Sequence, residues 1–269
     1  MKIGLGTYAL AWSIGVPGHP PENPMDIYQF LDFAHKSGFN LVQVADNLPL
    51  EQFNQDELDK ILDKSVSLGI EVEVGTRGMT PENIRRYLDI ALLFRSPILR
   101  TVIDVQGFEP TLHEIHKTVK AMIPDLEAAN IKLAIENHDR LKSSEFLEII
   151  RNANSEYVGI CLDTVNSIGA DEGFETVFSC LAPHTINLHL KDYTIKRKSH
   201  MMGFDIEGAP AGKGRIPINE ILKNLEVHGK CQSMILELWP PPEKELEKTI
   251  LKEQEWVRKS AHYLFENYK

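Results

Sequence analysis

The sequence predicts an α/β protein built as a single (β/α)8 barrel over residues 1–269. Short apolar runs rich in Val, Ile and Leu recur along the chain, and each is followed by a longer segment of helical periodicity. This alternation is typical of βαβ units and a parallel sheet. Eight runs can be counted, which favours a closed barrel over an open sheet. The length agrees, because such barrels run to about 250 residues as one domain.

The eight apolar runs are the expected barrel strands. In chain order they are Ile3–Tyr8, Leu41–Ala45, Ile70–Val74, Ile98–Ile103, Leu133–Glu136, Val158–Asp163, Ile186–Leu190 and Met234–Leu238.

The segments between these runs carry helix-boundary residues. Asn23-Pro24 precedes an expected helix near residues 25–37, and Thr80-Pro81-Glu82 opens another. These residue types start helices because they cap free backbone N–H groups or lack one. The last helix is expected to run from Glu243 or later to near the C-terminus.

Two connections are longer than a normal strand-to-helix loop, namely residues 9–24 and 191–217. Long loops in a compact barrel are usually functional. The second contains the glycine-rich segment Gly208–Gly214, which can fold over a ligand, and whether it acts as a lid stays open. It matches neither a P-loop nor a dinucleotide fingerprint, so nucleotide binding is not expected.

The charge and the cysteine content exclude several function classes. A formal net charge of −10 argues against nucleic acid and anionic membranes as partners. One basic cluster, around Lys191–Lys198 with Lys213 and Arg215, suits a small anionic substrate or a solvated loop. Three cysteines without a C-x-x-C motif argue against a disulfide framework. With no signal sequence or membrane-length apolar stretch, we expect a cytoplasmic protein.

Polar residues close the last four apolar runs, at the end of a barrel where active sites lie. They are Glu136, Asp163, His189 and Glu237. Three carboxylates that converge within a few ångströms need a compensating charge, which a divalent cation supplies. Three oxygen ligands and one imidazole suit Mn²⁺, Mg²⁺ or Co²⁺ and tolerate Zn²⁺. The sequence therefore predicts one divalent metal ion, with Mn²⁺ as the first choice.

With these residues in place, the sequence resembles the xylose isomerase-like TIM-barrel superfamily, the sugar phosphate isomerase and epimerase family. The group includes ketose 3-epimerases, inosose isomerases and dehydratases, hydroxypyruvate isomerases and zinc endonucleases. The resemblance covers essentially the whole chain and implies the fold and the metal site, but not the substrate. Its anchors are Ile135–Asn137, Cys161–Thr164, Leu188–Asp192, Gly212–Ile216 and Leu236–Leu238.

The resemblance to the epimerases implies a catalytic role for two of the ligands. Glu136 and Glu237 would face each other across the substrate, and each would move a proton on its own side of an enediolate. The alternative is that both glutamates only bind the metal. In the epimerases, a histidine three residues after the aspartate ligand touches the substrate. Here Asn166 stands at that position, which weakens the transfer of the epimerase assignment.

Six residues are the expected contacts for a small polyhydroxy substrate. Asn166 and His138 lie just after ligand-bearing strands, and Lys191 or Arg215 would replace an arginine that follows the histidine ligand in the relatives. Arg77 can clamp a carboxylate or phosphate, although a helix-capping or salt-bridge role is an equal alternative. Trp12 can stack on a sugar face or pack in the barrel mouth. The six are Asn166, Arg77, His138, Lys191, Arg215 and Trp12.

Two functions follow from this reading. The first is a metal-dependent isomerase or epimerase of a ketose or a related polyhydroxy carbonyl compound. The alternative is a lyase, either a decarboxylase or a dehydratase of a keto sugar acid, that uses the same enediolate. Pocket charge separates them, because a neutral ketose needs no arginine near the metal whereas a sugar acid is best held by Arg77, Lys191 or Arg215.

Two other functions are less compatible with the sequence. A zinc endonuclease needs further strand-end histidines, and Asn166 stands where one is expected, while the negative charge opposes DNA binding. A non-catalytic barrel would not need all four candidate ligands. A homo-oligomer is compatible with the resemblance, but no sequence feature identifies an interface.

Overall fold

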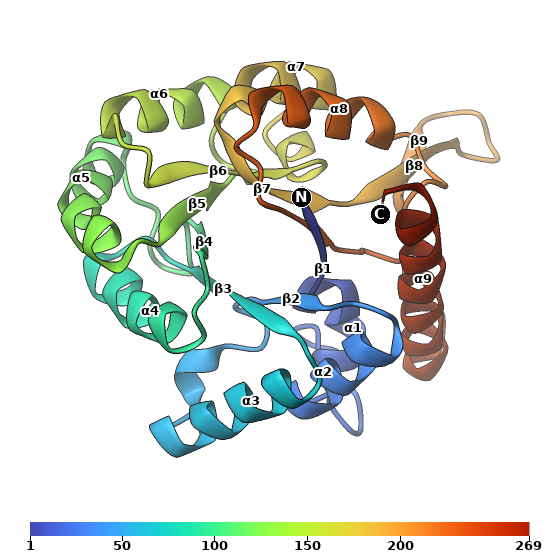
Figure 1. Ribbon diagram of the computed structural model, residues 1–269. Helices are drawn as coiled ribbons and strands as arrows, with labels where there is room; N and C mark the ends of the chain where they lie inside the picture. Colours follow the sequence, from blue (N-terminus) through green and yellow to red (C-terminus); the bar gives the residue numbers. More distant parts are fainter. Residues whose placement is uncertain (269) are drawn as a thin grey trace.

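The computed structural model describes residues 1–268, which form a closed barrel of eight parallel strands surrounded by helices (Figure 1). The barrel closes where the last strand pairs with the first, with Ser233 opposite Lys2. The predicted fold class is therefore confirmed, and each expected run overlaps one strand. The strands are β1 (Lys2–Gly6), β2 (Leu41–Val44), β3 (Glu71–Arg77), β4 (Ile98–Val102), β5 (Lys132–Glu136), β6 (Val158–Asp163), β7 (Thr185–Leu190) and β10 (Ser233–Leu236).

The helices cover the outside of the barrel, and their starts follow local capping chemistry. The first long helix begins two residues later than expected because the Asp26 side chain accepts a hydrogen bond from the Gln29 backbone and caps it. Thr80 caps the helix that Pro81 opens. The α-helices are α1 (Ala11–Ile14), α2 (Ile27–Lys36), α3 (Gln55–Ser67), α4 (Pro81–Leu93), α5 (Leu112–Ala129), α6 (Ser143–Ala153), α7 (Phe174–Leu181), α8 (Ile218–His228) and α9 (Leu246–Asn267).

Short 3-10 helices lie in the connections between these elements: η1 (Thr7–Leu10), η2 (Leu50–Gln52), η3 (Asn166–Ile168) and η4 (Ala182–His184). The start of the expected loop after β1, residues 9–14, is thus helical, because η1 runs directly into α1. Within residues 1–268, no helix is both long enough and apolar enough to span a membrane.

The apolar core lies mainly between the barrel and its helices, with large buried side chains such as Phe30, Tyr87 and Phe146. The buried residues of the strands also include an unusual number of polar groups. Barrel interiors are usually filled by layers of branched apolar side chains. Here Gln43, Glu73, Arg100, Asn187 and Ser233 are all buried, with at most 2% of any of them exposed. This polar interior lies directly beneath the site described below.

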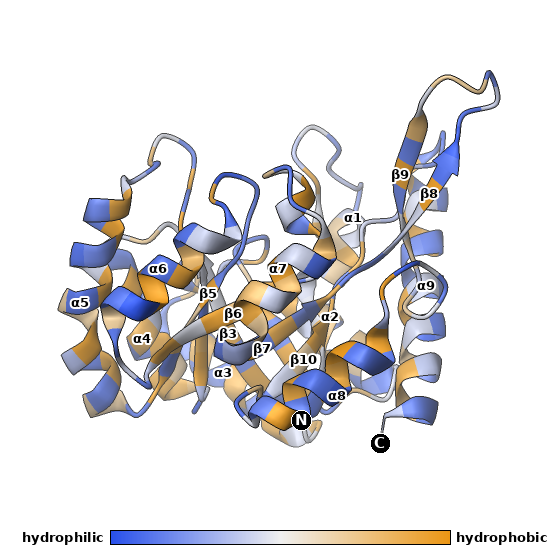
Figure 2. Cartoon of the chain, turned by 90° about the horizontal axis from the view of Figure 1, so that it is seen from above, coloured by the Kyte–Doolittle hydropathy of each residue, from blue (hydrophilic) through white to orange (hydrophobic). Residues whose placement is uncertain are grey.

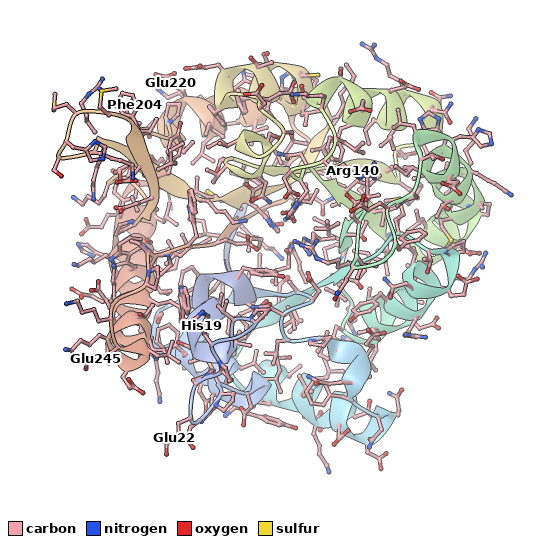
Figure 3. All side chains as sticks on the ribbon, turned by 180° about the vertical axis from the view of Figure 1, so that it is seen from behind. His19, Glu22, Arg140, Phe204, Glu220 and Glu245 are labelled. Carbon is pink, nitrogen blue, oxygen red and sulfur yellow. The ribbon has the colours of Figure 1, made fainter. Side chains whose placement is uncertain are left out.

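The long connection after β7 is a β-hairpin rather than an irregular loop. Strands β8 (Asp192–Arg197) and β9 (Phe204–Ala209) pair antiparallel and project from the rim (Figure 2). Phe204 lies near its outer end (Figure 3), beneath the Arg197 guanidinium. At the base, the Asp192 carboxylate accepts hydrogen bonds from the backbone N–H groups of Tyr193, Gly212, Gly214 and Ile216. Asp192 therefore ties both ends of the hairpin together.

Candidate active site

Four adjacent strands bring the four predicted metal ligands to the same end of the barrel. Glu136 ends β5, Asp163 ends β6, His189 is the fifth residue of β7, and Glu237 directly follows β10. Because the carboxyl ends of parallel strands share one rim, these side chains converge although they are up to about a hundred positions apart. Each is at most 1% exposed.

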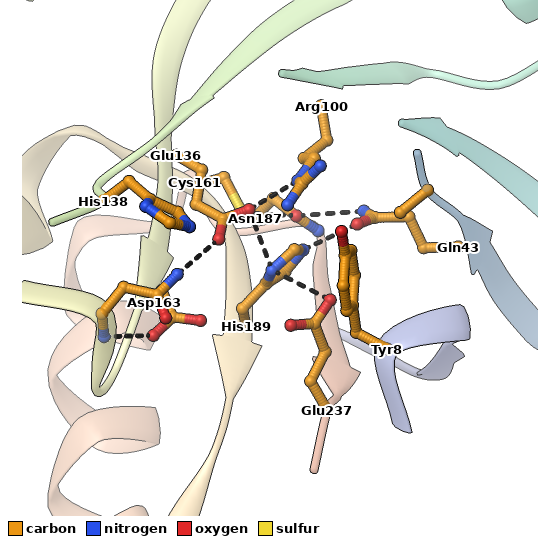
Figure 4. A network of polar contacts seen from close by, with 12 residues as sticks. Tyr8, Gln43, Arg100, Glu136, His138, Cys161, Asp163, Asn187, His189 and Glu237 are labelled. Carbon is orange, nitrogen blue, oxygen red and sulfur yellow. Dashed lines mark hydrogen bonds and ion pairs between the residues drawn. The ribbon is translucent and has the colours of Figure 1, made fainter. Parts of the chain in front are cut away.

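The four side chains form a compact set centred on His189 (Figure 4). His189 Nδ1 lies 3.2 Å from Glu136 Oε2 and 3.3 Å from Glu237 Oε1. One ligand atom each from Asp163, His189 and Glu237 lie within 4.8 Å of one another. Cys161 joins Glu136 and His189 in a second group of this kind, so a thiol lies against the same histidine.

The set has the chemistry that a divalent cation requires. In the described part of the chain, few buried side-chain atoms lack a hydrogen-bond partner, and they include Asp163 Oδ2, His189 Nδ1 and both carboxylate oxygens of Glu237. Buried polar atoms are normally paired, so a cluster of unpaired oxygens and one imidazole nitrogen fits a bound cation. His189 Nε2 lies 2.6 Å from Gln43 Oε1, an acceptor, which leaves Nδ1 to face the carboxylates.

Lys191 lies inside this set rather than at its edge. Its Nζ is 2.8 Å from Asp163 Oδ2 and 2.9 Å from Glu237 Oε2. These distances are those of ion pairs, but the two carboxylate oxygens still lack hydrogen-bond geometry and can accept a further ligand. The positive charge of Lys191 therefore lies beside the candidate metal ligands.

Arg100, on β4, is a second cation in the site, and sequence reasoning did not select it. Its Nε lies 2.5 Å from Glu136 Oε2, and its Nη1 lies 2.9 Å from Asp46 Oδ1. The other oxygen of Glu136 accepts a 2.8 Å hydrogen bond from Asn166 Nδ2. Both oxygens of Glu136 are thus occupied. The sequence feature that could have identified Arg100 is its position as a charged residue inside the apolar run Ile98–Ile103.

The surrounding charges keep both glutamates ionised. Burial would raise the pKa of Glu136, but the charge of Arg100 holds that pKa well below its usual range. Burial also opposes ionisation of Glu237, yet the charges of His189 and Lys191 lower its pKa to about 2. At neutral pH both side chains are therefore carboxylates, which can bind a cation or accept a proton.

Asp46 organises the wall of the site next to Arg100. Arg77, at the end of β3, places its Nε 3.0 Å from Asp46 Oδ2, and the Tyr8 hydroxyl donates to the same oxygen at 2.9 Å. Arg77 Nη2 also lies 3.4 Å from His138 Nε2. Burial raises the pKa of Tyr8, so its phenol stays neutral. Arg77 thus makes the salt bridge that the sequence left as an alternative, while it stays next to His138.

Two cavities open above the carboxylates. One, of about 410 Å³, is lined by Tyr8 and Trp12, and the other, of about 360 Å³, is lined by His138 and Asn166. Lys191, Ile206 of the hairpin and Trp239 line both cavities. A further cavity of about 570 Å³ lies around Lys2 and Glu71 at the amino ends of the strands, away from the carboxylates. The mouth above the site is therefore bounded on one side by the hairpin.

Four of the six predicted substrate contacts line these cavities, and Arg77 lies beside one of the four, His138. Trp12 is fixed there by a hydrogen bond from its indole nitrogen to the Pro240 carbonyl at 3.2 Å. Arg215 differs, because it is exposed at the base of the hairpin and lines neither of the two cavities. The structure brings together Trp12, Arg77, His138, Asn166 and Lys191, and it leaves Arg215 apart.

The fold is that of an enzyme superfamily. Residues 31–260 match the family described as xylose isomerase-like TIM barrel, and the chain belongs to this family. The resemblance seen in the sequence is thereby confirmed.

Particular relatives differ in their chemistry. The chain is 31% identical over 267 residues to a 3-oxo-isoapionate decarboxylase of Pectobacterium atrosepticum, and the match covers 98% of this chain and 95% of the relative. A structure of D-psicose 3-epimerase with D-tagatose from Clostridium cellulolyticum H10 has a TM-score of 0.72 at 14% identity, covering 99% and 98% of the two chains. A Mycobacterium smegmatis barrel protein in complex with magnesium has a TM-score of 0.70 at 14% identity, covering 97% of each chain.

Proposed function

We propose that the protein is a metal-dependent lyase that removes CO2 from a keto sugar acid whose carbonyl lies β to the carboxylate. The observation that carries this proposal is a pair of cations, the buried Arg100 and the partly buried Lys191, in contact with the carboxylates Asp163, Glu237 and Glu136. The 31% identity to a 3-oxo-isoapionate decarboxylase supports it.

The charge of the site favours an anionic substrate. Four carboxylates, those of Asp46, Glu136, Asp163 and Glu237, face the three cationic side chains of Arg77, Arg100 and Lys191. A divalent cation held by Glu136, Asp163, His189 and Glu237 would make this site net positive. A net positive charge does not favour the binding of a neutral ketose, whereas it stabilises a bound carboxylate.

The reaction needs charge stabilisation more than it needs a base. When the bond to the carboxylate breaks, CO2 leaves, the electron pair enters the neighbouring carbonyl to form an enolate, and the carbon then takes up a proton from water. A divalent cation supplies a Lewis acid for the negative oxygen. The Lys191 ammonium, which lines both cavities, adds a positive charge where the substrate must pass.

The state of Glu136 also fits a lyase better than a two-base enzyme. Epimerisation through two glutamates requires that each carboxylate can accept a proton from the substrate. Both oxygens of Glu136 are already hydrogen-bonded, one to Arg100 and one to Asn166. Glu136 is therefore less available as a base than Glu237, whose two carboxylate oxygens lack a hydrogen-bond partner.

An isomerase or epimerase acting on a ketose is the second candidate. Glu136 and Glu237 both approach His189 Nδ1, at 3.2 and 3.3 Å, as a metal-bound acid/base pair would. The fold is also that of a D-psicose 3-epimerase. In that case Asn166 would contact a substrate hydroxyl while it keeps its hydrogen bond to Glu136.

The test uses metal-loaded enzyme in D2O with two substrate panels, keto sugar acids labelled with ¹³C in the carboxyl group and neutral ketoses. We expect labelled CO2 to be released from the keto acids and no deuterium to enter the ketoses beside their carbonyl. Deuterium in a ketose without loss of carbon would instead establish the isomerase. A His189→Gln enzyme serves as the control for contaminating activities.

A further inference from the structure

A chain of buried polar side chains crosses the barrel beneath His189. Gln43 on β2 is fully buried, and its Oε1 lies 2.6 Å from His189 Nε2 (Figure 4). The Gln43 amide nitrogen donates to Glu73 Oε2 at 3.0 Å and to Asn187 Oδ1 at 3.2 Å. Asn187 Nδ2 in turn lies 3.3 Å from Glu73 Oε2.

This arrangement allows the Gln43 amide only one orientation. Both partners of its nitrogen are acceptor oxygens, so a flipped amide would place Oε1 against the oxygens of Glu73 and Asn187. It would also leave the two amide hydrogens facing His189. The same Glu73 oxygen sets the orientation of Asn187, because Asn187 Nδ2 lies 3.3 Å from Glu73 Oε2 and also donates to Ser233 Oγ at 2.8 Å.

The fixed orientation of the Gln43 amide determines which ring nitrogen of His189 carries a hydrogen. An amide oxygen only accepts, so His189 Nε2 must carry the hydrogen of the 2.6 Å contact. The other nitrogen, Nδ1, is then the atom left for a cation, and it is the one that faces Glu136 and Glu237. The His189 ring thus donates to Gln43, and Gln43 in turn donates to Glu73.

A merely structural role accounts less well for these residues. Barrel interiors are usually filled by branched apolar side chains, and a buried polar group is costly unless it is paired. Apolar residues of similar size would fill the same space. This polar chain ends on a candidate metal ligand, which a role in filling space does not explain.

We propose that Gln43 and Glu73 are positioning residues that hold His189 with Nε2 as a hydrogen-bond donor and Nδ1 as the metal ligand. The inference rests on the proposed metal-dependent function. Residues that orient a metal-bound histidine typically contribute about 10-fold to 100-fold to metal affinity.

The experiment compares the wild type with Gln43→Met, Glu73→Met and a control, Ser96→Ala. Ser96 is buried at the amino end of β4 and its hydroxyl bonds only Ile98 and Val74, outside the chain of polar residues. Co²⁺ alone is the probe, and its affinity is measured by competition with a chelator. Proton NMR of the Co²⁺ protein reports the exchangeable Nε2–H of the single histidine ligand as a hyperfine-shifted signal.

For Gln43→Met we expect a 10-fold to 100-fold loss of Co²⁺ affinity and loss of the shifted Nε2–H signal through fast exchange. Glu73→Met should show a smaller loss of affinity, because Gln43 stays but its amide is free to turn. Ser96→Ala should match the wild type. Circular dichroism checks folding, and Glu73→Met carries the test if Gln43→Met does not fold.

Folded variants that bind Co²⁺ as the wild type does and keep the shifted signal would overturn the inference. A wild type that binds no Co²⁺ would be a different result, because it would overturn the proposed metal centre and this inference with it.

Discussion

Lys191 Nζ lies 2.8 Å from Asp163 Oδ2, a carboxylate with no exposed side-chain surface. The contact arises because Lys191 follows His189 by two residues, and alternate side chains of an extended chain share one face. The lysine therefore points toward the same centre as the histidine. A residue that the sequence suggests as a substrate contact is thus also a charge partner of two candidate metal ligands.

Lys191→Met should lower kcat for decarboxylation by about 100-fold to 1,000-fold, because one partly buried positive charge at the reacting centre is lost. The affinity for Mn²⁺ should not fall, because the substitution removes the lysine charge that pairs with Asp163 and Glu237 and competes with the metal ion for them. Steady-state CO2 release and a Mn²⁺ titration measure both. Lys196→Met is the matched control, because Lys196 is exposed on the hairpin and pairs with Glu207. Equal kcat in the two variants would contradict the role of Lys191.

Arg100→Met should destabilise the protein by about 3–5 kcal/mol, because it leaves the buried carboxylate of Glu136 and the partly buried one of Asp46 without this partner. Urea unfolding in the presence of a chelator measures the change. The control is Arg85→Met, which breaks an exposed pair with Asp125 and should cost about 0–1 kcal/mol. A loss below 1 kcal/mol in Arg100→Met would show that the buried pair is not needed for stability.

Mn²⁺ should stabilise the folded protein, since its ligands converge only in the barrel. At a free concentration of a hundred times Kd, we expect the free energy of unfolding to rise by about 2.7 kcal/mol. Chelation should reverse this, and His189→Gln should abolish it. Glu207→Gln, on the exposed hairpin, should keep the full effect. Stabilisation that survives in His189→Gln would place the ion elsewhere.

Glu253 on α9 should make stability depend on pH. Its carboxylate accepts hydrogen bonds from the Trp12 and Ser13 backbone, which ties α9 to the helix that carries Trp12. Burial raises its pKa from 4.5 to about 7, which those hydrogen bonds only partly oppose. The folded state therefore retains a proton that the unfolded state releases. This contribution is complete below about pH 4.5 and declines as pH rises to about 7, by about 3 kcal/mol in all.

The measurement is the free energy of unfolding of metal-free wild type and Glu253→Gln across that pH range. Their difference should change by about 3 kcal/mol, with the wild type losing stability relative to the variant as pH rises. A difference that is constant with pH, or that changes in the opposite direction, would contradict the shifted pKa.

The strands were predictable because an apolar run followed by a helical segment is a local property. The run Leu133–Glu136 and strand β5 differ by one residue. The third strand extends to Arg77, three residues past the predicted end, because Thr76 and Arg77 pair with Thr101 and Val102 of β4. That pairing adds backbone hydrogen bonds which no local hydrophobic pattern records. The sequence did not predict the hairpin β8–β9 either. Its two strands do not alternate between buried and exposed residues, so they carry no hydrophobic pattern that identifies a strand.

By itself, the sequence determined the closed barrel and the strand ends at which Glu136, Asp163, His189 and Glu237 meet. Both depend on hydrophobic periodicity and on the rule that parallel strands end on one rim. Only the tertiary structure decided that Arg100 clamps Glu136, that Gln43 holds His189, and that Arg215 lies apart. These contacts join different strands, and their distances depend on strand order, register and side-chain length around the closed barrel, none of which is encoded in a local stretch of residues.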